Sequence, residues 1–130
     1  MTKNNEFNIG KVYDRREIAE KLGGNYQRAL QHTNGKVTAG CYDPGMNPNA
    51  PGEILVGRGT EKEHYSEQLA NEKYSIPVFL KRGNKGYEFI GYYQALRYSI
   101  DPKEIEQKNN TDRNNDDIAG VLYFEEAVTV

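Results

Sequence analysis

Two adjacent arginines, Arg15 and Arg16, stand where the sequence predicts the first turn of a helix. Asp14 and Glu17 have the three-residue spacing of a capping box, so a helix should begin at Arg15. The first turn of a helix already carries positive potential and disfavours cations. Two arginines at this point therefore predict an anion, such as a phosphate, bound against them. The alternative is that both side chains point into water.

This helix is expected to be the middle of a strand, helix and turn unit over residues 10–28. Val12 and Tyr13 can end a strand just before the helix. Gly23 and Gly24 should end the helix, because glycine accepts the left-handed backbone conformation without a steric penalty. The arginines are thus held between a strand and a glycine turn.

Alternating and buried-type apolar runs predict further strands at residues 36–42, 53–56, 76–81, 87–99 and 118–128. A helix is expected from residue 60 to about residue 71, because Thr60 and Glu63 have the spacing of a capping box, and another from residue 102. Residues 76–99 should form a hairpin with a bulge at Gly91. Residues 25–34 are predicted as a loop or broken helix, 43–52 as a proline-rich loop and 108–117 as a polar loop. The expected fold is a single α+β domain over residues 1–130, with a mostly antiparallel, barrel-like sheet and short helices in the connections.

Composition argues against several classes of site. The 130 residues carry a net charge of −2, so the chain as a whole has no basic excess for nucleic acid, although basic residues gather in its first half. One cysteine, Cys41, excludes an internal disulfide and is expected to be a small buried side chain. His32 and His64 lack metal-site spacing, so we expect no metal and no cofactor. Without a long apolar run or signal peptide, the expected location is the cytoplasm and no membrane is involved.

Catalytic motifs are missing from the sequence. Asp101 with Glu106 and Lys108 suggests a nuclease pattern, but a capped helix explains these residues better. Neither a Gly-x-Ser-x-Gly element nor a phosphate-binding Gly-Lys-Ser/Thr element occurs. We therefore expect the chain not to be an enzyme by itself.

The order of several short motifs resembles the SRA-like domains of McrA-type modification-dependent restriction endonucleases, which belong to the PUA-like superfamily. The motifs are a Gly-x-Val-Tyr-x-Arg start with a Gly-Gly turn and a following glutamine, an acidic aromatic turn, a strand ending in Gly-x-Gly, and two later strands. They comprise residues 10–15 and 23–27, Tyr42-Asp43, residues 54–59, residues 77–81 and 87–92, and the closing strand at residues 120–125. At the central turn, Arg58 stands where the family favours a glutamate.

The resemblance implies a module that binds double-stranded DNA and recognises a modified base, such as 5-methyl- or 5-hydroxymethylcytosine, by flipping it out of the duplex. It would act in restriction or defence with a nuclease partner or fused nuclease domain. Under this hypothesis, Tyr13, Tyr26 and Tyr42 would form pocket walls and Asp43 would accept a hydrogen bond from an exocyclic amine. Each tyrosine could instead be a core ring with a satisfied hydroxyl.

The same hypothesis assigns a set of residues to the DNA backbone. Cations are expected to bind phosphates, and glycines to let the backbone approach closely. The set comprises Arg15, Arg16, Arg28, Arg58 and Lys81, with Gly23, Gly24, Asn25, Gln27, Gly57 and Gly59. Two alternatives remain open on the sequence: a PUA-like protein-interaction or regulatory module, such as a defence or anti-defence inhibitor, and an RNA-binding PUA-like domain.

Overall fold

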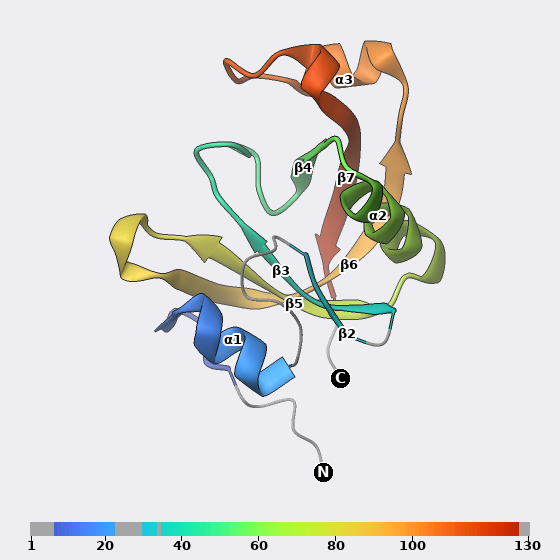
Figure 1. The fold of residues 1–130 in the computed structure, drawn as a ribbon. Coiled ribbons are helices and arrows are strands. Elements are labelled where there is room, and N and C mark those ends of the chain that lie inside the picture. Colours follow the sequence, from blue (N-terminus) through green and yellow to red (C-terminus); the bar gives the residue numbers. More distant parts are fainter. Residues whose placement is uncertain (1–6, 23–29, 34, 128–130) are drawn as a thin grey trace.

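A curled sheet of seven strands is the centre of the fold, with helices packed around it (Figure 1). The computed structural model describes residues 7–22, 30–33 and 35–127. The strand order is β2 (Leu30–Thr33), β3 (Lys36–Tyr42), β5 (Ser75–Lys81), β6 (Tyr87–Ser99), β7 (Ile118–Glu126) and β4 (Glu53–Gly57), and β1 (Val12–Tyr13) pairs with β6 off this path. No helix in the described stretches is both long enough and apolar enough to cross a membrane.

The elements follow the chain in an order close to the predicted one. The strands are β1 (Val12–Tyr13), β2 (Leu30–Thr33), β3 (Lys36–Tyr42), β4 (Glu53–Gly57), β5 (Ser75–Lys81), β6 (Tyr87–Ser99) and β7 (Ile118–Glu126). The α-helices are α1 (Arg15–Leu22), α2 (Thr60–Glu72) and α3 (Pro102–Lys108), and the short 3₁₀ helices are η2 (Gly83–Lys85) and η3 (Asn115–Asp117).

Most strand pairs are antiparallel, as the sequence predicts, and β3 with β5 is parallel. The α+β, mostly antiparallel, curled sheet confirms the predicted fold class. The predicted β5–β6 hairpin is present, and its register shifts beside Gly91, since Val78 pairs with Gly91 but Phe79 pairs with Phe89. Gly91 has φ of 130°, a conformation open mainly to glycine, which confirms the predicted bulge.

The sheet is buried on both faces around β5. Ile76, Val78 and Leu80 pack into a core cluster with α2, whereas Phe79 points to the other face. There it meets Ile18 of α1, which is fully buried. Each face of β5 thus buries apolar area, which stabilises the fold by about 25 cal/mol per Å². Because a shift of one residue would exchange the two faces, this burial fixes the register of the central strands.

The helix starts follow local capping chemistry. At α1, the Asp14 N–H donates to Glu17 Oε1 (3.1 Å) and the Glu17 N–H donates to Asp14 Oδ1 (2.8 Å), so the predicted capping box is confirmed. At α3, the N–H of Lys103 donates to Asp101 Oδ1 over 3.0 Å, again as predicted.

Two local predictions are wrong. The sequence predicts Thr60 as the cap of α2, but Gly59 is the N-cap residue and its N–H donates to Glu63 Oε2 (3.1 Å). Glu63 therefore reaches one residue further back than the pattern suggests. Leu30–Thr33 forms β2 although the sequence predicts a loop or broken helix, because pairing with β3 supplies backbone hydrogen bonds that local sequence does not indicate.

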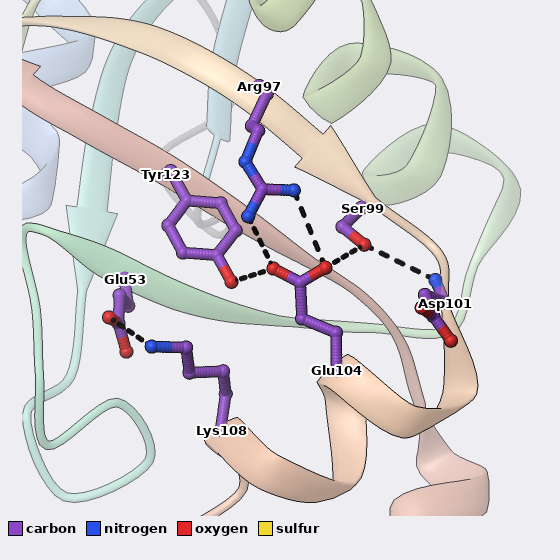
Figure 2. A network of polar contacts seen from close by, with 7 residues as sticks. All are labelled: Glu53, Arg97, Ser99, Asp101, Glu104, Lys108 and Tyr123. Atoms are coloured by element: carbon purple, nitrogen blue, oxygen red, sulfur yellow. Dashed lines mark hydrogen bonds and ion pairs between the residues drawn. The ribbon is translucent and has the colours of Figure 1, made fainter.

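A polar network fastens α3 to the sheet (Figure 2). The Glu104 carboxylate accepts hydrogen bonds from Arg97 Nη2 (2.6 Å), Ser99 Oγ (2.6 Å) and the Tyr123 hydroxyl. Hydrogen bonds from Arg97, then Ser99 and Tyr123, lower the pKa of Glu104 from its ordinary value of 4.5 to about 2. Burial, followed by the Glu104 hydrogen bond, raises the pKa of Tyr123 to about 12.

We predict that Glu104→Gln lowers the thermal unfolding midpoint at pH 7. A carboxylate with a depressed folded-state pKa contributes fully above pH 4.5, and this contribution is lost as the pH falls towards about 2. The difference between the native chain and the variant should therefore shrink over that pH range. Scanning calorimetry from pH 7 to pH 2 measures it.

The matched control is Glu106→Gln, on an exposed position of the same helix. It should change the midpoint little at any pH. If both variants shifted the midpoint equally, the Glu104 network would not be what holds α3 on the sheet.

Candidate nucleic-acid interface

A cavity of about 330 Å³ opens at the edge of the sheet where β3 and β5 end. Tyr42 is the last residue of β3 and Asp43 follows it, while Lys81 is the last residue of β5. The two strands are parallel, with Tyr42 opposite Leu80, so both chains leave the sheet at the same edge. Tyr42, Asp43 and Lys81 consequently line one cavity.

The start of α1 reaches the same cavity through a short strand pairing. Tyr13 of β1 pairs with Tyr87, the first residue of β6, and α1 begins two residues after Tyr13. The Arg15 guanidinium lies 5.0 Å from the centre of the Tyr87 ring, and both residues line the cavity. Stacking on this ring holds the Arg15 charge at the cavity.

Helix α2 forms another wall. Lys62 and Ser66 lie four residues apart, on the same helix face, and both line the cavity. Gly57, at the end of β4, lies beneath Lys62. A Cβ atom at Gly57 would be 3.4 Å from Lys62 Nζ and 3.6 Å from Arg113 Nη2. These are ordinary van der Waals separations, so both cations lie close to the Gly57 backbone although a larger side chain would also fit there.

Arg113 comes from the polar loop that the sequence predicts at residues 108–117, and side-chain hydrogen bonds attach this loop to the rest of the fold. Asn109 Nδ2 donates to the carbonyl of Arg113 (2.8 Å) and so folds the segment back on itself. Arg113 Nη1 then donates to the carbonyls of Met46 (3.2 Å) and Leu55 (3.1 Å). Burial lowers the pKa of Arg113 from its ordinary value, although Asp117 partly opposes this.

The proline-rich loop after β3 is ordered by two side chains. Asp43 Oδ1 accepts a hydrogen bond from the Gly45 N–H (2.8 Å) and shapes the turn. Asn47 is buried, and its Oδ1 accepts from the Leu55 N–H (2.8 Å), which ties the loop to β4. Asp43 is thereby held at the cavity, and no described residue forms a hydrogen bond with its other carboxylate oxygen.

Charge is distributed unevenly around this cavity. Of its lining residues, Arg15, Lys62, Lys81 and Arg113 are basic and Asp43 alone is acidic. The chain as a whole has a net charge of −2. The cavity is therefore a local positive site on an acidic protein, and its walls focus that potential on an anionic ligand.

The inner walls are mainly apolar. Ile54, Leu55 and Val56 of β4 line the cavity. Tyr42 Oη and Ser66 Oγ are buried and have no hydrogen-bond partner within the described part of the chain. Burial raises the pKa of Tyr42, so its hydroxyl keeps its proton and can donate. Cys41 is buried, as the sequence predicts, and this burial raises its pKa to about 12.

Five of the predicted site residues meet at this cavity: Arg15, Tyr42, Asp43, Gly57 and Lys81. Six others lie outside the described residues, namely Gly23, Gly24, Asn25, Tyr26, Gln27 and Arg28. The cavity residues that sequence reasoning missed include Lys62, Ser66 and Arg113. Only the four-residue spacing of Lys62 and Ser66 on a predicted helix gave any signal.

Four predicted residues lie away from the cavity lining. Tyr13 is a core ring, packed edge-on against Phe7 (5.1 Å between ring centres), and its hydroxyl accepts from the Asn8 N–H (2.8 Å). Arg16 is exposed on α1. Arg58 Nε donates to the carbonyl of Asp116 (2.7 Å), and Gly59 caps α2. The interpretation of Tyr13 as a wall of the same pocket as Tyr42 is thus corrected, because its side chain is satisfied within the core.

Within residues 7–22, 30–33 and 35–127, no group of three or more His, Cys, Asp or Glu side chains could hold a metal ion. The cavity's chemistry is that of cations and one carboxylate beside apolar walls. This set suits a ligand that combines an anionic backbone with a planar base carrying an amine.

Comparison with solved structures shows an SRA-like fold. The SUVH5 SRA domain in complex with hemimethylated CG DNA has a TM-score of 0.66 at 12% identity, covering 98% of this chain and 93% of that one. The same domain bound to fully hydroxymethylated CG DNA has a TM-score of 0.67 at 11% identity, with coverages of 98% and 93%. The predicted SRA-like fold is therefore confirmed. Neither the family models nor the curated proteins gave a match.

Restriction endonucleases share the fold over part of their length. The modification-dependent restriction endonuclease TagI matches with a TM-score of 0.55 at 13% identity, over 94% of this chain and 50% of that one. The Type IV phosphorothioation-dependent restriction endonuclease ScoMcrA matches with a TM-score of 0.56 at 14% identity, over 90% and 27%. This chain thus spans half or less of each of these two enzymes.

We predict that Asn47→Ala destabilises the fold by about 1–3 kcal/mol, because the buried Leu55 N–H loses its acceptor. Urea unfolding measures the change. Asn49→Ala is the matched control, since the Asn49 side chain bonds Glu53 at the surface (3.2 Å), and it should cost less than about 0.5 kcal/mol. Equal effects would mean that Asn47 does not organise the loop.

Proposed function

We propose that this chain binds double-stranded DNA and recognises a modified cytosine that is flipped out of the duplex into the cavity. The observation that carries the proposal is the cavity's charge, four cations around one carboxylate on a chain of net charge −2. Cations at the rim suit phosphates, and a single carboxylate inside suits the amine of cytosine. A concave site lined by cations concentrates positive potential and so favours an anionic ligand.

Asp43 and Tyr42 are the proposed base-reading residues. Asp43 uses one carboxylate oxygen for its own turn and presents the other to the cytosine N4 amine. Tyr42, with Ile54 and Val56, supplies surface against which the base packs. Flipping costs a few kcal/mol, and stacking and edge hydrogen bonds of about 1–3 kcal/mol each recover it.

Arg15, Lys62, Lys81 and Arg113 are the proposed phosphate contacts nearest the cavity. Lys62 and Arg113 both approach the Gly57 backbone, so a phosphate oxygen above Gly57 could meet two cations at once. Arg16 and Arg58 are exposed outside the cavity lining and remain proposed contacts farther along the duplex.

The matched structures support this proposal by what they bind. SUVH5 SRA was solved with methylated and with hydroxymethylated CG DNA. TagI is described as modification-dependent, and its greater length supports a nuclease partner or fused domain as the source of any cleavage. In this proposal the chain itself reads the modification and does not cut DNA.

We predict that the native chain binds a duplex with a single modified cytosine at least about tenfold more tightly than the plain duplex. Asp43→Asn should weaken binding to the modified duplex about tenfold or more. The amide oxygen would accept from the Gly45 N–H, as Asp43 Oδ1 does, and the amide NH₂ would then face the N4 amine, donor against donor. Fluorescence anisotropy with plain, 5-methyl- and 5-hydroxymethylcytosine duplexes measures both. Equal affinity of the native chain for all three would refute base reading.

The phosphate contacts are tested by salt dependence. We predict that Lys62→Ala weakens binding to every duplex alike and reduces the slope of log affinity against log salt by about 0.9. Lys103→Ala, on the exposed surface of α3 and outside the cavity lining, is the matched control and should leave the slope unchanged. If Lys62→Ala left the slope unchanged, Lys62 would not contact the DNA backbone.

A further inference from the structure

Arg113 holds one edge of its guanidinium group open to the cavity. One nitrogen, Nη1, donates to the carbonyls of Met46 (3.2 Å) and Leu55 (3.1 Å), which fixes the orientation of the group. The other, Nη2, has no hydrogen-bond partner in the described part of the chain, yet it is not among the fully buried atoms that lack one. It therefore keeps surface that a ligand can reach. The open edge of a fixed guanidinium suits the oxygens of a phosphate.

Lys62 brings a second cation to the same point of the backbone. A Cβ atom at Gly57 would be 3.4 Å from Lys62 Nζ and 3.6 Å from Arg113 Nη2. Among the residues that the structure describes, neither cation forms an ion pair with a carboxylate. Asp117 favours the Arg113 charge, but from beyond ion-pair distance. Two like charges held together repel each other, and an anion bound between them removes that cost.

A single turn of the loop after β3 connects this cation pair to Asp43. The Met46 N–H donates to the Asp43 carbonyl (3.0 Å), and the Met46 carbonyl accepts from Arg113 (3.2 Å). Asp43 and Arg113 are thus attached to one turn through its backbone, and both line the cavity. The cavity volume of about 330 Å³ is within the range of small-molecule sites. A base acceptor and a phosphate site therefore belong to one cavity.

From this arrangement we infer that the cavity binds a free cytosine nucleoside monophosphate as well as a nucleotide in DNA. Lys62 and Arg113 hold the phosphate, and Asp43 accepts a hydrogen bond from the N4 amine. A phosphate monoester carries a charge of about −1.5 to −2, so it gains more from two cations than the single charge of a DNA phosphate does. The inference rests on the proposed role of Asp43 and extends the ligands of the proposed site from DNA to free nucleotides.

The experiment is a calorimetric titration of the native chain with 5-methyl-2′-deoxycytidine 5′-monophosphate, with the same nucleoside lacking phosphate, and with thymidine 5′-monophosphate. We expect the cytosine nucleotide to bind at least about tenfold more tightly than its nucleoside, because the nucleoside leaves the cation pair unoccupied. Thymidine monophosphate, which has the same methyl group, should bind about tenfold more weakly than the cytosine nucleotide. Its O4 is an acceptor and would face the Asp43 carboxylate.

Lys62→Ala is the variant that tests the phosphate site. Lys62 is exposed and has no ion-pair partner among the described residues, so its replacement should leave the thermal midpoint unchanged. We expect it to bring the ratio of nucleotide to nucleoside affinity towards one, because it removes a charge-assisted hydrogen bond to the phosphate. Lys103→Ala removes an equal charge from the exposed surface of α3, outside the cavity lining, and should keep the native ratio.

Several outcomes would overturn the inference. If the nucleotide and its nucleoside bind equally, or neither binds, while the modified duplex is still preferred over the plain one, the inference is wrong and the proposed function stands. The inference is also wrong if Lys62→Ala keeps the native ratio, or if thymidine monophosphate binds as tightly as the cytosine nucleotide. If the nucleotide binds as expected but modified and plain duplexes bind equally, the inference stands and the proposed function fails.

Discussion

The parallel pairing of β3 with β5 is the constraint on which the cavity depends. In this pairing Tyr42 lies opposite Leu80, so Asp43 and Lys81 leave adjacent strands at one edge of the sheet. If β3 ran antiparallel to β5, the two strand ends would lie at opposite edges and the carboxylate would be separated from the lysine. The η2 turn then returns the chain to the same edge as Tyr87, where β1 pairs and delivers Arg15. Backbone hydrogen bonds between strands thus bring most of the site residues together, independently of contacts between their side chains.

Local chemistry explains why much of the fold is predictable. The Asp14 and Glu17 box, the Asp101 cap and the β5–β6 hairpin depend on residues a few positions apart, and all three are present in the structure. β2 could not be predicted, because its strand conformation comes from pairing with β3 and its own four residues show no clear alternation. The cap of α2 shifted by one residue because Glu63 reaches the Gly59 N–H.

The site is less predictable because tertiary contacts decide which residues line the cavity. The chain has 10 tyrosines, and their sequence contexts do not separate a core ring from a pocket wall. The difference between Tyr13 and Tyr42 is tertiary: a backbone N–H from Asn8 satisfies one hydroxyl, and the other finds no partner among the described residues. Ser66 and Arg113 lie in an ordinary helical position and a polar loop, and burial alone shows that they matter.

Helix α2 presents two residues to the cavity, Lys62 and Ser66, one turn apart on a single face. One is a flexible cation and the other is a small buried side chain. Because both project from one face of the same helix, a rotation of α2 about its axis would move them together and would change the charge and the shape of the cavity at the same time.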